Sequence, residues 1–359
     1  MPDGLTFDDI LILPGYTDFK RRDVSLATEL HSTIVLPLPV ISSPMDTVTD
    51  DAMARALAVA GGLGIIHRNL TVAAQATMVA KVNKDKLLVG AAVGIGSDFE
   101  ERVAALVAAG ADMLVIDSGH GNTQFMVDAI GFIKKAYAKA VVMAGNIATL
   151  DGASRLIAAG ADILRVGMGP GSICTTRIIT GMGVPQISAI QEAVKAVNVM
   201  KAKHVAIVAD GGIRQIGDMA KALAVGADAV MLGSLLAGFD ESPGDVVSVS
   251  GKKYKSYRGM GSIAAMKQGS AERYGQTRDT NERKLIPEGV EGLVGYKGSV
   301  TQYLDQVSGS LKSSFYYIGA QTLPEFHKKA EIVRITPASM IESHPHSITV
   351  TDGGQNYQI

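Results

Sequence analysis

The chain has 359 residues, of which 47% are hydrophobic and 19% are charged, so it can bury a large core. Lysine and arginine together number 34 against 35 acidic residues, which leaves a formal net charge of -1. A nearly neutral chain gives no electrostatic reason to bind nucleic acid or an anionic membrane surface, so any phosphate must be held locally by backbone amides and a few side chains.

The N-terminal segment has no basic start followed by an apolar run, so no signal peptide is expected. No uncharged apolar stretch reaches the roughly 18 residues that would suggest a membrane span. The single cysteine, Cys174, cannot form an internal disulfide, which fits a reducing compartment. These features predict a cytoplasmic protein without a membrane segment.

Eight short apolar runs rich in β-branched residues follow one another along the chain. They span residues 38–46, 63–67, 87–93, 113–118, 140–147, 163–169, 204–212 and 229–237. Each run is apolar throughout rather than alternating, which is typical of parallel strands that are covered on both faces. We therefore expect eight parallel strands.

Helical patterns separate these runs, for example at residues 98–109, 188–200 and 216–225. Three helices end alike, with Ala-Gly-Ala-Asp at 109–112 and 159–162 and Val-Gly-Ala-Asp at 225–228. Glycine just after a helix supplies the left-handed residue that ends it, and the next strand begins at once. Eight repeated units predict an α/β fold, a (β/α)8 TIM barrel, as a single domain over residues 1–359. A doubly wound sheet is the alternative, and the count of eight favours the barrel.

The repeat breaks after the eighth strand. Residues 239–299 are rich in Gly, Ser, Lys and Arg, and a last helix is expected near residues 301–311. A segment of that length inside a compact domain is usually a functional lid or is disordered. Because it is anchored at both ends and holds concentrated glycines, we expect an active-site flap.

The segment after the sixth strand, residues 167–177 (GMGPGSICTTR), is the most informative part of the sequence. Its glycines let the backbone approach a ligand closely and turn several amides into one space. Active sites of such barrels lie at the C-terminal ends of the strands, where Cys174 falls beside Arg177, which would favour its thiolate. A lone cysteine is more often buried and inert, but a glycine-rich rim loop is an unusual place for core filling. We therefore expect a nucleophile at Cys174.

Glycine and polar residues also follow the last two predicted strands, as Asp210-Gly-Gly212 and Gly233-Ser234. Backbone amides at this corner of such barrels often bind a phosphate, although structural glycines explain each pair taken alone. With Ser172 and residues 257–261 (YRGMG) added, a nucleotide monophosphate is the better interpretation. The histidines show no metal-ligand spacing, and the Gly-x-Ser-x-Gly elbow of serine hydrolases does not occur.

Several motifs in order resemble those of the IMP dehydrogenase/GMP reductase family. They are residues 42–48 (SSPMDTV), 167–177, 209–213 (ADGGI), 257–262 (YRGMGS) and 287–292 (PEGVEG). The resemblance runs over almost the whole chain, from residues 5–9 (LTFDD) to 342–346 (ESHPH). Within the family, Arg273-Tyr274 resembles the flap dyad that activates water in the dehydrogenases and is lacking in the reductases. Residues 65–69 (IIHRN) are also similar to the dehydrogenase version of that turn.

The resemblance implies oxidation of IMP to XMP by NAD, a step of guanine nucleotide biosynthesis, through a covalent thioimidate on Cys174. It makes Arg273 the base for the water that releases XMP, oriented by Thr176 and Tyr274. The flap would move in after NADH leaves, because flap and cofactor compete for one space. The alternatives are GMP reductase, which deaminates GMP with NADPH, and a non-catalytic nucleotide-binding barrel. The presence of the dyad argues against the reductase. The presence of the dyad together with Cys174 and Thr176 argues against a non-catalytic barrel.

The resemblance also assigns binding positions. Those for IMP are Ser43, Met45, Asn146, Ser172, Asp210, Gly211, Gly212, Gly233, Ser234, Tyr257, Gly259, Met260, Gly261 and Glu288. Those for NAD are Asp117, Ser118, Gly119, Gly167, Met168 and Gly169. A potassium ion is implied at the carbonyls of Gly169, Gly171 and Cys174, completed by Glu342, Ser343 and His344 of a neighbouring subunit. Such a shared site implies a homotetramer.

One departure from the family is plain. Most of its dehydrogenases carry a pair of CBS regulatory modules between the second helix and the third strand, where this chain has only residues near 71–85. We therefore expect no CBS domain. The barrel keeps what the chemistry needs, and we expect no regulation by nucleotides through such modules.

Overall fold

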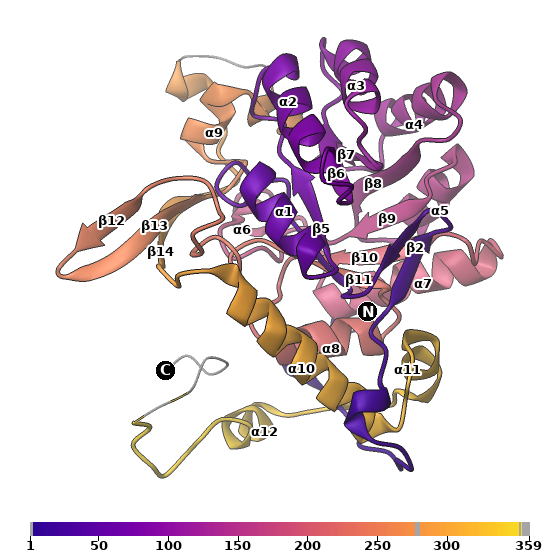
Figure 1. The fold of residues 1–359 in the computed structure, drawn as a ribbon, viewed down its shortest axis with the longest axis vertical. Helices are drawn as coiled ribbons and strands as arrows, with labels where there is room; N and C mark the ends of the chain where they lie inside the picture. Colours follow the sequence, from indigo (N-terminus) through magenta and orange to yellow (C-terminus); the bar gives the residue numbers. More distant parts are fainter. Residues whose placement is uncertain (1–2, 277–280, 352, 354–359) are drawn as a thin grey trace.

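A computed structural model describes residues 3–276, 281–351 and 353 of the chain. Eight parallel strands form one closed barrel in which each strand pairs with the next along the chain and the last pairs with the first (Figure 1). The strands are β4 (Val40–Ser42), β5 (Leu63–Ile66), β6 (Val89–Val93), β7 (Met113–Asp117), β8 (Val141–Ile147), β9 (Ile163–Val166), β10 (Ala206–Asp210) and β11 (Ala229–Leu232). The predicted (β/α)8 TIM barrel is confirmed, with all eight runs in the predicted order.

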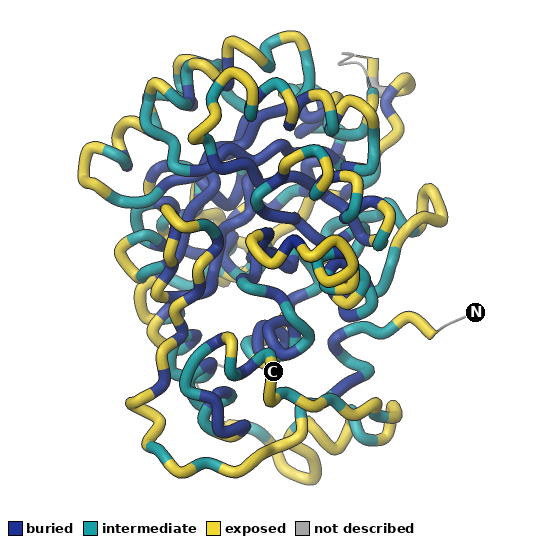
Figure 2. The backbone as a smooth tube through the Cα atoms, turned by 90° about the vertical axis from the view of Figure 1, so that its right-hand side faces the viewer, coloured by how far each residue is buried: buried dark blue, intermediate teal, exposed yellow. Residues whose placement is uncertain are grey.

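Helices follow the strands and cover the outside of the barrel (Figure 1). They are α1 (Asp51–Val59), α2 (Val72–Asn83), α3 (Phe99–Ala108), α4 (Gln124–Ala136), α5 (Leu150–Ala159), α7 (Gln186–Val199), α8 (Ile216–Ala224) and α10 (Val300–Ile318), with the short α6 (Thr176–Thr180) between β9 and α7. The backbone of the strands is buried, and the outer turns of the helices are exposed (Figure 2). The predicted helices at 98–109, 188–200 and 216–225 correspond to α3, α7 and α8.

The strands are apolar on both faces because each face meets a different core. In β7, Met113 and Val115 belong to the cluster that fills the barrel, whereas Leu114 and Ile116 belong to the cluster between barrel and helices. The N-terminal end of the barrel is closed by the hairpin of β2 (Thr28–His31) and β3 (Ile34–Leu36), whose apolar side chains join the inner cluster. This hairpin was not predicted.

The repeated Gly-Ala-Asp sequences end three helices as predicted. Gly110, Gly160 and Gly226 have φ angles of 87°, 97° and 105°. The aspartates that follow have a role that the sequence did not reveal. The carboxylates of Asp112, Asp162 and Asp228 accept hydrogen bonds of 2.7–2.8 Å from backbone amides at or next to the start of the preceding strand. Each repeat therefore ties neighbouring strands together at the N-terminal end of the barrel.

We call residues 239–299 the flap. Among the residues that the structure describes there, β12 (Val246–Val249), β13 (Lys252–Arg258) and β14 (Glu291–Gly295) form an antiparallel sheet that projects from the barrel (Figure 1). The connection from β13 to β14 includes α9 (Ile263–Gln268) and the 3-10 helices η3 (Ser270–Tyr274) and η4 (Glu282–Lys284). The described part of the flap thus contains a three-stranded sheet and short helices.

The flap is anchored to the barrel by a buried lysine. Lys255, on β13, is 2% exposed, and its Nζ donates hydrogen bonds to the carbonyls of Phe239 and Ser242 at 3.0 and 2.5 Å. An ammonium group buried in this way is stabilised by the carbonyl dipoles. This fixes the root of the projecting sheet next to the end of β11.

Several boundaries differ from the prediction. The last helix, expected near residues 301–311, extends from Val300 to Ile318 because its apolar stripe continues through Phe315, and it ends at Gly319, whose φ is 80°. The strands β4 and β11 are shorter than the runs 38–46 and 229–237, and the remaining residues of those runs continue beyond the strand ends. After α10 the chain forms α11 (Leu323–Lys329), β15 (Ile332–Arg334), which pairs with β1 (Ile10–Ile12), and α12 (Pro337–Glu342).

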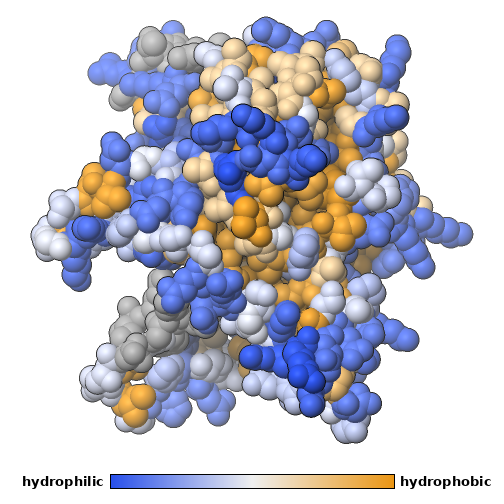
Figure 3. Space-filling view, viewed as in Figure 1, coloured by the Kyte–Doolittle hydropathy of each residue, from blue (hydrophilic) through white to orange (hydrophobic). Residues whose placement is uncertain are grey.

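The surface combines charged areas with a broad apolar area in the middle of one face (Figure 3). Large exposed apolar side chains include Val59 on α1 and Val246 and Val249 on β12, which are 75%, 44% and 45% exposed. None of the described helices has the length and apolar character needed to span a bilayer.

Candidate active site

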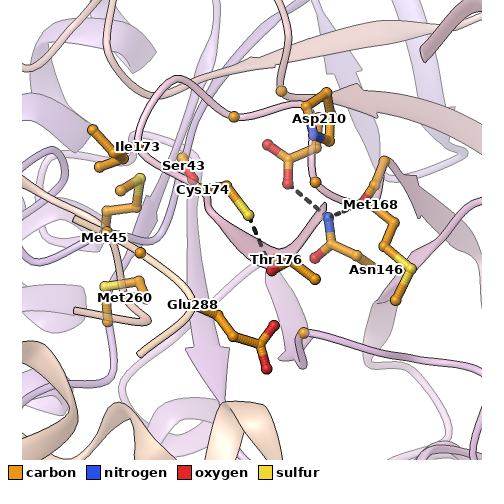
Figure 4. Close-up of a pocket in the computed structure, with 18 of the residues that line it drawn as sticks. Ser43, Met45, Asn146, Met168, Ile173, Cys174, Thr176, Asp210, Met260 and Glu288 are labelled. Atoms are coloured by element: carbon orange, nitrogen blue, oxygen red, sulfur yellow. Dashed lines mark hydrogen bonds between the residues drawn. The ribbon is translucent and has the colours of Figure 1, made fainter. Parts of the chain in front are cut away.

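Cys174 lies in the loop that joins β9 to α6, at the C-terminal end of the barrel (Figure 4). The loop requires glycine at its start: Gly167 has a φ of 149°, and a Cβ atom there would lie 2.0 Å from the carbonyl oxygen of Asp210. The Cys174 side chain is half-buried, and its Sγ donates a hydrogen bond to Thr176 Oγ1 at 3.1 Å. The thiol therefore faces a cavity rather than the core, held beside a hydroxyl group.

One cavity at this rim brings together most of the predicted site residues. The four predicted catalytic residues, Cys174, Thr176, Arg273 and Tyr274, all line it. The predicted IMP-binding residues in its wall are Ser43, Met45, Asn146, Asp210, Gly211, Tyr257, Gly259, Met260 and Glu288, and the predicted NAD-binding residues are Gly119, Gly167, Met168 and Gly169. In the close-up, Met45, Ile173 and Met260 lie on one side of Cys174, and the carboxylate of Glu288 lies below Thr176 (Figure 4).

An adjoining cavity extends the site toward the ends of β10 and β11. It is lined by the remaining predicted IMP-binding residues except Gly261, namely Ser172, Gly212, Gly233 and Ser234. Gly261 packs against the flap dyad, because a Cβ atom there would lie 2.9 Å from the ring of Tyr274. The Tyr257 hydroxyl is hydrogen-bonded to Ser172 and Ser234, and burial raises the pKa of Tyr257 to about 12, so the phenol is protonated at neutral pH. Hydroxyl groups and glycine amides of this kind suit a phosphate group.

Asp210, at the end of β10, is held in place between the two cavities. Its Oδ2 accepts hydrogen bonds from Asn146 Nδ2 and from Arg165 Nε, both at 2.8 Å. Asn146 Nδ2 also donates to the carbonyl of Gly167 at 3.0 Å (Figure 4). The carboxylate is therefore oriented before any ligand binds, and it can accept hydrogen bonds from a ligand's hydroxyl groups.

Asp117, at the end of β7, is the centre of a buried ion cluster. Arg165 Nη1 donates to its Oδ1 at 2.6 Å, and Arg273 Nη1 from the flap contacts the same oxygen. Its other oxygen, Oδ2, has no hydrogen-bond partner among the described residues, and Arg68 Nε lies 3.8 Å away. Asp117 was predicted to hold the cofactor. That role stays a prediction; in this structure the carboxylate contacts Arg273 of the flap.

The flap dyad lies against the predicted cofactor residues. The amide of Gly119 donates to the carbonyl of Arg273 at 2.8 Å, and a Cβ atom on Gly119 would lie 3.3 Å from the ring of Tyr274. Burial lowers the pKa of Arg273 and raises the pKa of Tyr274. The buried oxygen Oδ2 of Asp117 lacks a hydrogen bond among the described residues. A ligand at Gly119 and the flap dyad cannot occupy this place together.

Arg177 makes contacts that were not predicted. Its guanidinium group donates to the carbonyls of Met168 and Val184 at 3.2 and 2.6 Å, and a Cβ atom on Gly169 would lie 2.6 Å from its side chain. The arginine therefore holds the shape of the glycine loop. Its predicted influence on the thiol of Cys174 stays a prediction.

The residues predicted to hold potassium are not brought together within one chain. Gly169, Gly171 and Cys174 share the loop, where the amide of Cys174 donates to the carbonyl of Gly171 at 3.1 Å. Glu342, Ser343 and His344 lie at the end of α12, which is away from α6 (Figure 1). The prediction already required a second subunit, and it stays a prediction. The carbonyl oxygens of the glycine loop are the type of ligand that fits a hard monovalent cation.

Two buried arginines of the site were not predicted. Arg68 follows β5 and Arg165 lies within β9, and the two residues are 8% and 2% exposed. Arg165 gave a visible signal, because it is a charge in the middle of the apolar run ILRVG. A charge at that place must be paired inside the barrel.

The fold and the site together define a barrel enzyme with a cysteine at the rim, a hydroxyl-lined corner for an anion, and a flap over both. The sequence profile described as the IMP dehydrogenase / GMP reductase domain matches residues 4–346. The inosine-5'-monophosphate dehydrogenase of Borreliella burgdorferi is 42% identical, over 96% of this chain and 97% of that protein. The enzymes of the same name from Rhizobium tropici and Halalkalibacterium halodurans are 36% and 35% identical, over at least 97% of this chain and 95% of theirs. The chain belongs to the IMP dehydrogenase/GMP reductase family.

The alignments also bear on the expectation that the chain has no CBS modules. They extend over 396, 476 and 483 positions, more than the 359 residues of this chain, so the relatives contain residues that this chain lacks. In the structure, five residues separate the end of α2 at Asn83 from the start of β6 at Val89. The residues near 71–85, which were expected to lie between the second helix and the third strand, form that helix, α2, so the connection is shorter than predicted.

Proposed function

We propose that the protein is an NAD-dependent IMP dehydrogenase that oxidises IMP to XMP. The observation that carries the proposal is the common cavity of Cys174, Thr176, Arg273 and Tyr274, next to a corner suited to a phosphate. The names of the relatives support the same activity. The dyad of Arg273 and Tyr274 favours the dehydrogenase over the reductase, because oxidation requires a water molecule to release the product.

In the proposed reaction, IMP binds with its phosphate near Ser172, Gly212 and Ser234, and Asp210 accepts hydrogen bonds from the ribose. The thiolate of Cys174 forms a bond to C2 of the purine, and the hydride on C2 leaves to NAD, which supplies the oxidising power. The result is a thioimidate between C2 and Sγ. Water then adds to C2, the bond from carbon to sulfur breaks, and XMP leaves with the thiolate restored.

The water step belongs to the flap in this proposal. Arg273 takes the proton of the attacking water, while Thr176 and Tyr274 orient that water. Arginine is an unusual base because its pKa lies above about 12 in isolation. Burial of Arg273 in the closed flap favours the neutral form, since a charged group loses its hydration there.

The finer parts of the proposal concern ligands and assembly. NAD would lie at Asp117, Ser118 and Gly119 when the flap is open, and potassium would support the carbonyls of the glycine loop. Apolar side chains beside the site support a homotetramer: Ile178 and Met182 are 85% and 64% exposed in the single chain. The protein would act in the cytoplasm.

A comparison of two reactions tests the proposed function. The purified protein is given IMP with NAD and, separately, GMP with NADPH, and absorbance at the NADH band is followed in a potassium buffer. We expect NADH to form from IMP and XMP to accumulate in equal amount. Consumption of NADPH with GMP and no reaction with IMP would identify a reductase, and inactivity with both pairs would leave only a nucleotide-binding barrel.

A further inference from the structure

Arg68 is a buried cation to which the proposed mechanism gives no part. It follows β5, its side chain is 7% exposed, and its Nε has no hydrogen-bond partner among the described residues. A Cβ atom on Gly94 would lie 2.7 Å from its Nη1, so the loop after β6 leaves room for the guanidinium group only because that residue is glycine. Burying a guanidinium group whose Nε lacks a hydrogen bond is costly, and the position of Arg68 therefore requires an explanation.

The partner that Arg68 faces is Asp117. Arg68 Nε lies 3.8 Å from Oδ2, the oxygen of Asp117 that lacks a hydrogen bond, whereas Arg165 and Arg273 share the opposite oxygen, Oδ1. Three guanidinium groups thus surround one carboxylate, and a second carboxylate, Asp210, pairs with Arg165 alone. With the flap closed, Arg68, Arg165 and Arg273 share the buried carboxylates of Asp117 and Asp210, and the exposed carboxylate of Glu272 also acts on Arg68.

We infer that Arg68 is a positioning residue for the water step, because it places a fixed positive charge against the carboxylate that receives Arg273 when the flap closes. Arg68 and Arg165 are contributed by the barrel, whereas Arg273 arrives with the flap. Closure therefore brings the third cation next to a carboxylate that two cations already share. The inference rests on the proposed function, since it concerns the base of that reaction.

The positive charge of Arg68 affects the protonation of Arg273. A like charge nearby disfavours the protonated form of a base, so Arg68 makes it easier for Arg273 to lose its proton. Burial lowers the pKa of Arg273, Tyr274 opposes this, and Arg68 lowers that pKa further. The titratable or charged groups around the dyad are Asp117, Arg165, Arg68, Glu272, Cys174 and Glu288. Arg165 and Arg273 both contact Oδ1 of Asp117, whereas Arg68 makes no hydrogen bond to that carboxylate.

The test measures the water step by itself. Arg68→Met removes the charge and keeps the length, Arg68→Gln keeps a polar group, and Arg68→Lys keeps the charge. Arg102→Met is the matched control, because Arg102 is also buried and lies on α3, but its partners are Asp98, Gln75 and the carbonyl of Leu70. For each variant, two quantities are measured from pH 6 to pH 10. The first is the single-turnover rate of NADH formation at saturating NAD. The second is the rate of thioimidate decay, measured by intact mass.

We expect Arg68→Met to form NADH at the normal rate and to release XMP several-fold more slowly, because the neutral fraction of Arg273 falls when the like charge is removed. The pH profile of thioimidate decay moves to higher pH, because the pKa of Arg273 rises when the like charge is removed. Arg68→Gln behaves in the same way. Arg68→Lys restores decay to within about twofold of the wild type, and Arg102→Met leaves the profile in place.

Two results would overturn the inference while leaving the proposed function intact. The first is a normal burst of NADH and an unchanged decay profile in Arg68→Met, or in Arg68→Gln if the methionine variant does not fold. The second is equal slowing in Arg68→Met, Arg68→Lys and Arg102→Met, which would assign the effect to loosened packing. Failure of the proposed function looks different, because the wild-type protein would then form neither NADH nor a thioimidate.

Discussion

Replacing Arg273 with alanine separates the two chemical steps of the proposed reaction. The side chain is 10% exposed, pairs with Oδ1 of Asp117 and donates to Asn146 Oδ1 at 3.4 Å. None of these contacts is made to Cys174. We therefore expect Arg273→Ala to form NADH once per active site at nearly normal speed and then to stall as the thioimidate.

The Arg273→Ala substitution should slow thioimidate decay strongly and reduce the stability of the protein only slightly. Loss of a general base typically slows its step by about 10²–10⁴-fold, and thioimidate decay should slow by that factor. Breaking a buried ion pair costs about 3–5 kcal/mol when one partner is left alone. Asp117 is not left alone, because Arg165 still donates to it at 2.6 Å and Arg68 lies 3.8 Å away. The loss of global stability should therefore be well below that range.

The assay combines rapid mixing with intact mass. Absorbance at the NADH band gives the size and rate of the first turnover, and the mass of the protein shows whether a nucleotide stays attached to Cys174. Arg273→Lys is the control that retains a cation for Asp117. A solvent-exposed role for Arg273 would predict less than a twofold change in turnover. Disappearance of the burst itself would refute the separation of the steps and assign Arg273 to binding or hydride transfer.

Three further predictions follow from the same site. Cys174→Ala should bind IMP but give no burst of NADH in rapid mixing, and a burst from this variant would exclude the covalent step. Potassium should raise turnover several-fold over sodium or lithium, because an ion would support the carbonyls of Gly169 and Gly171; equal rates in the three salts would contradict this. Burial lowers the pKa of His67 to about 4, so the unfolded chain binds one more proton between pH 6.5 and 4 and stability falls as the pH falls. Melting curves should show a loss on the order of 3 kcal/mol over that range for the wild type and a smaller one for His67→Asn.

The barrel was predictable because its signals are local and repeated. Runs such as 113–118 are apolar on both faces, and three glycines mark the helix ends. The sheet of the flap was missed although one signal was present: Ser250 and Gly251, between β12 and β13, have φ angles of 50° and 78°, and a small residue followed by glycine is typical of a hairpin turn. The abundance of glycine and lysine in that segment concealed the two short strands.

The residues of the site were predicted from motifs, but their pairing was not. Asp117 and Arg165 are 48 residues apart in the sequence, and Arg165 and Asp210 are 45 apart, so their ion pairs depend on the closure of the barrel. Arg68 gave no signal because a basic residue in a loop after a strand is usually exposed. Only the three-dimensional arrangement shows that it faces the carboxylate that the flap uses.

The position of Asp117 imposes an order on the proposed reaction. The flap reaches this carboxylate through Arg273 and contacts Gly119 through the backbone, and both residues were predicted to hold NAD. A bound cofactor would therefore displace the dyad, and the base would be absent while hydride is transferred. Water activation would begin only after NADH leaves and the flap closes, when Arg273 enters a cluster that already holds Arg68 and Arg165. The carboxylate proposed to bind the cofactor would then also recruit the base, so that hydride transfer would precede hydrolysis without any further element of control.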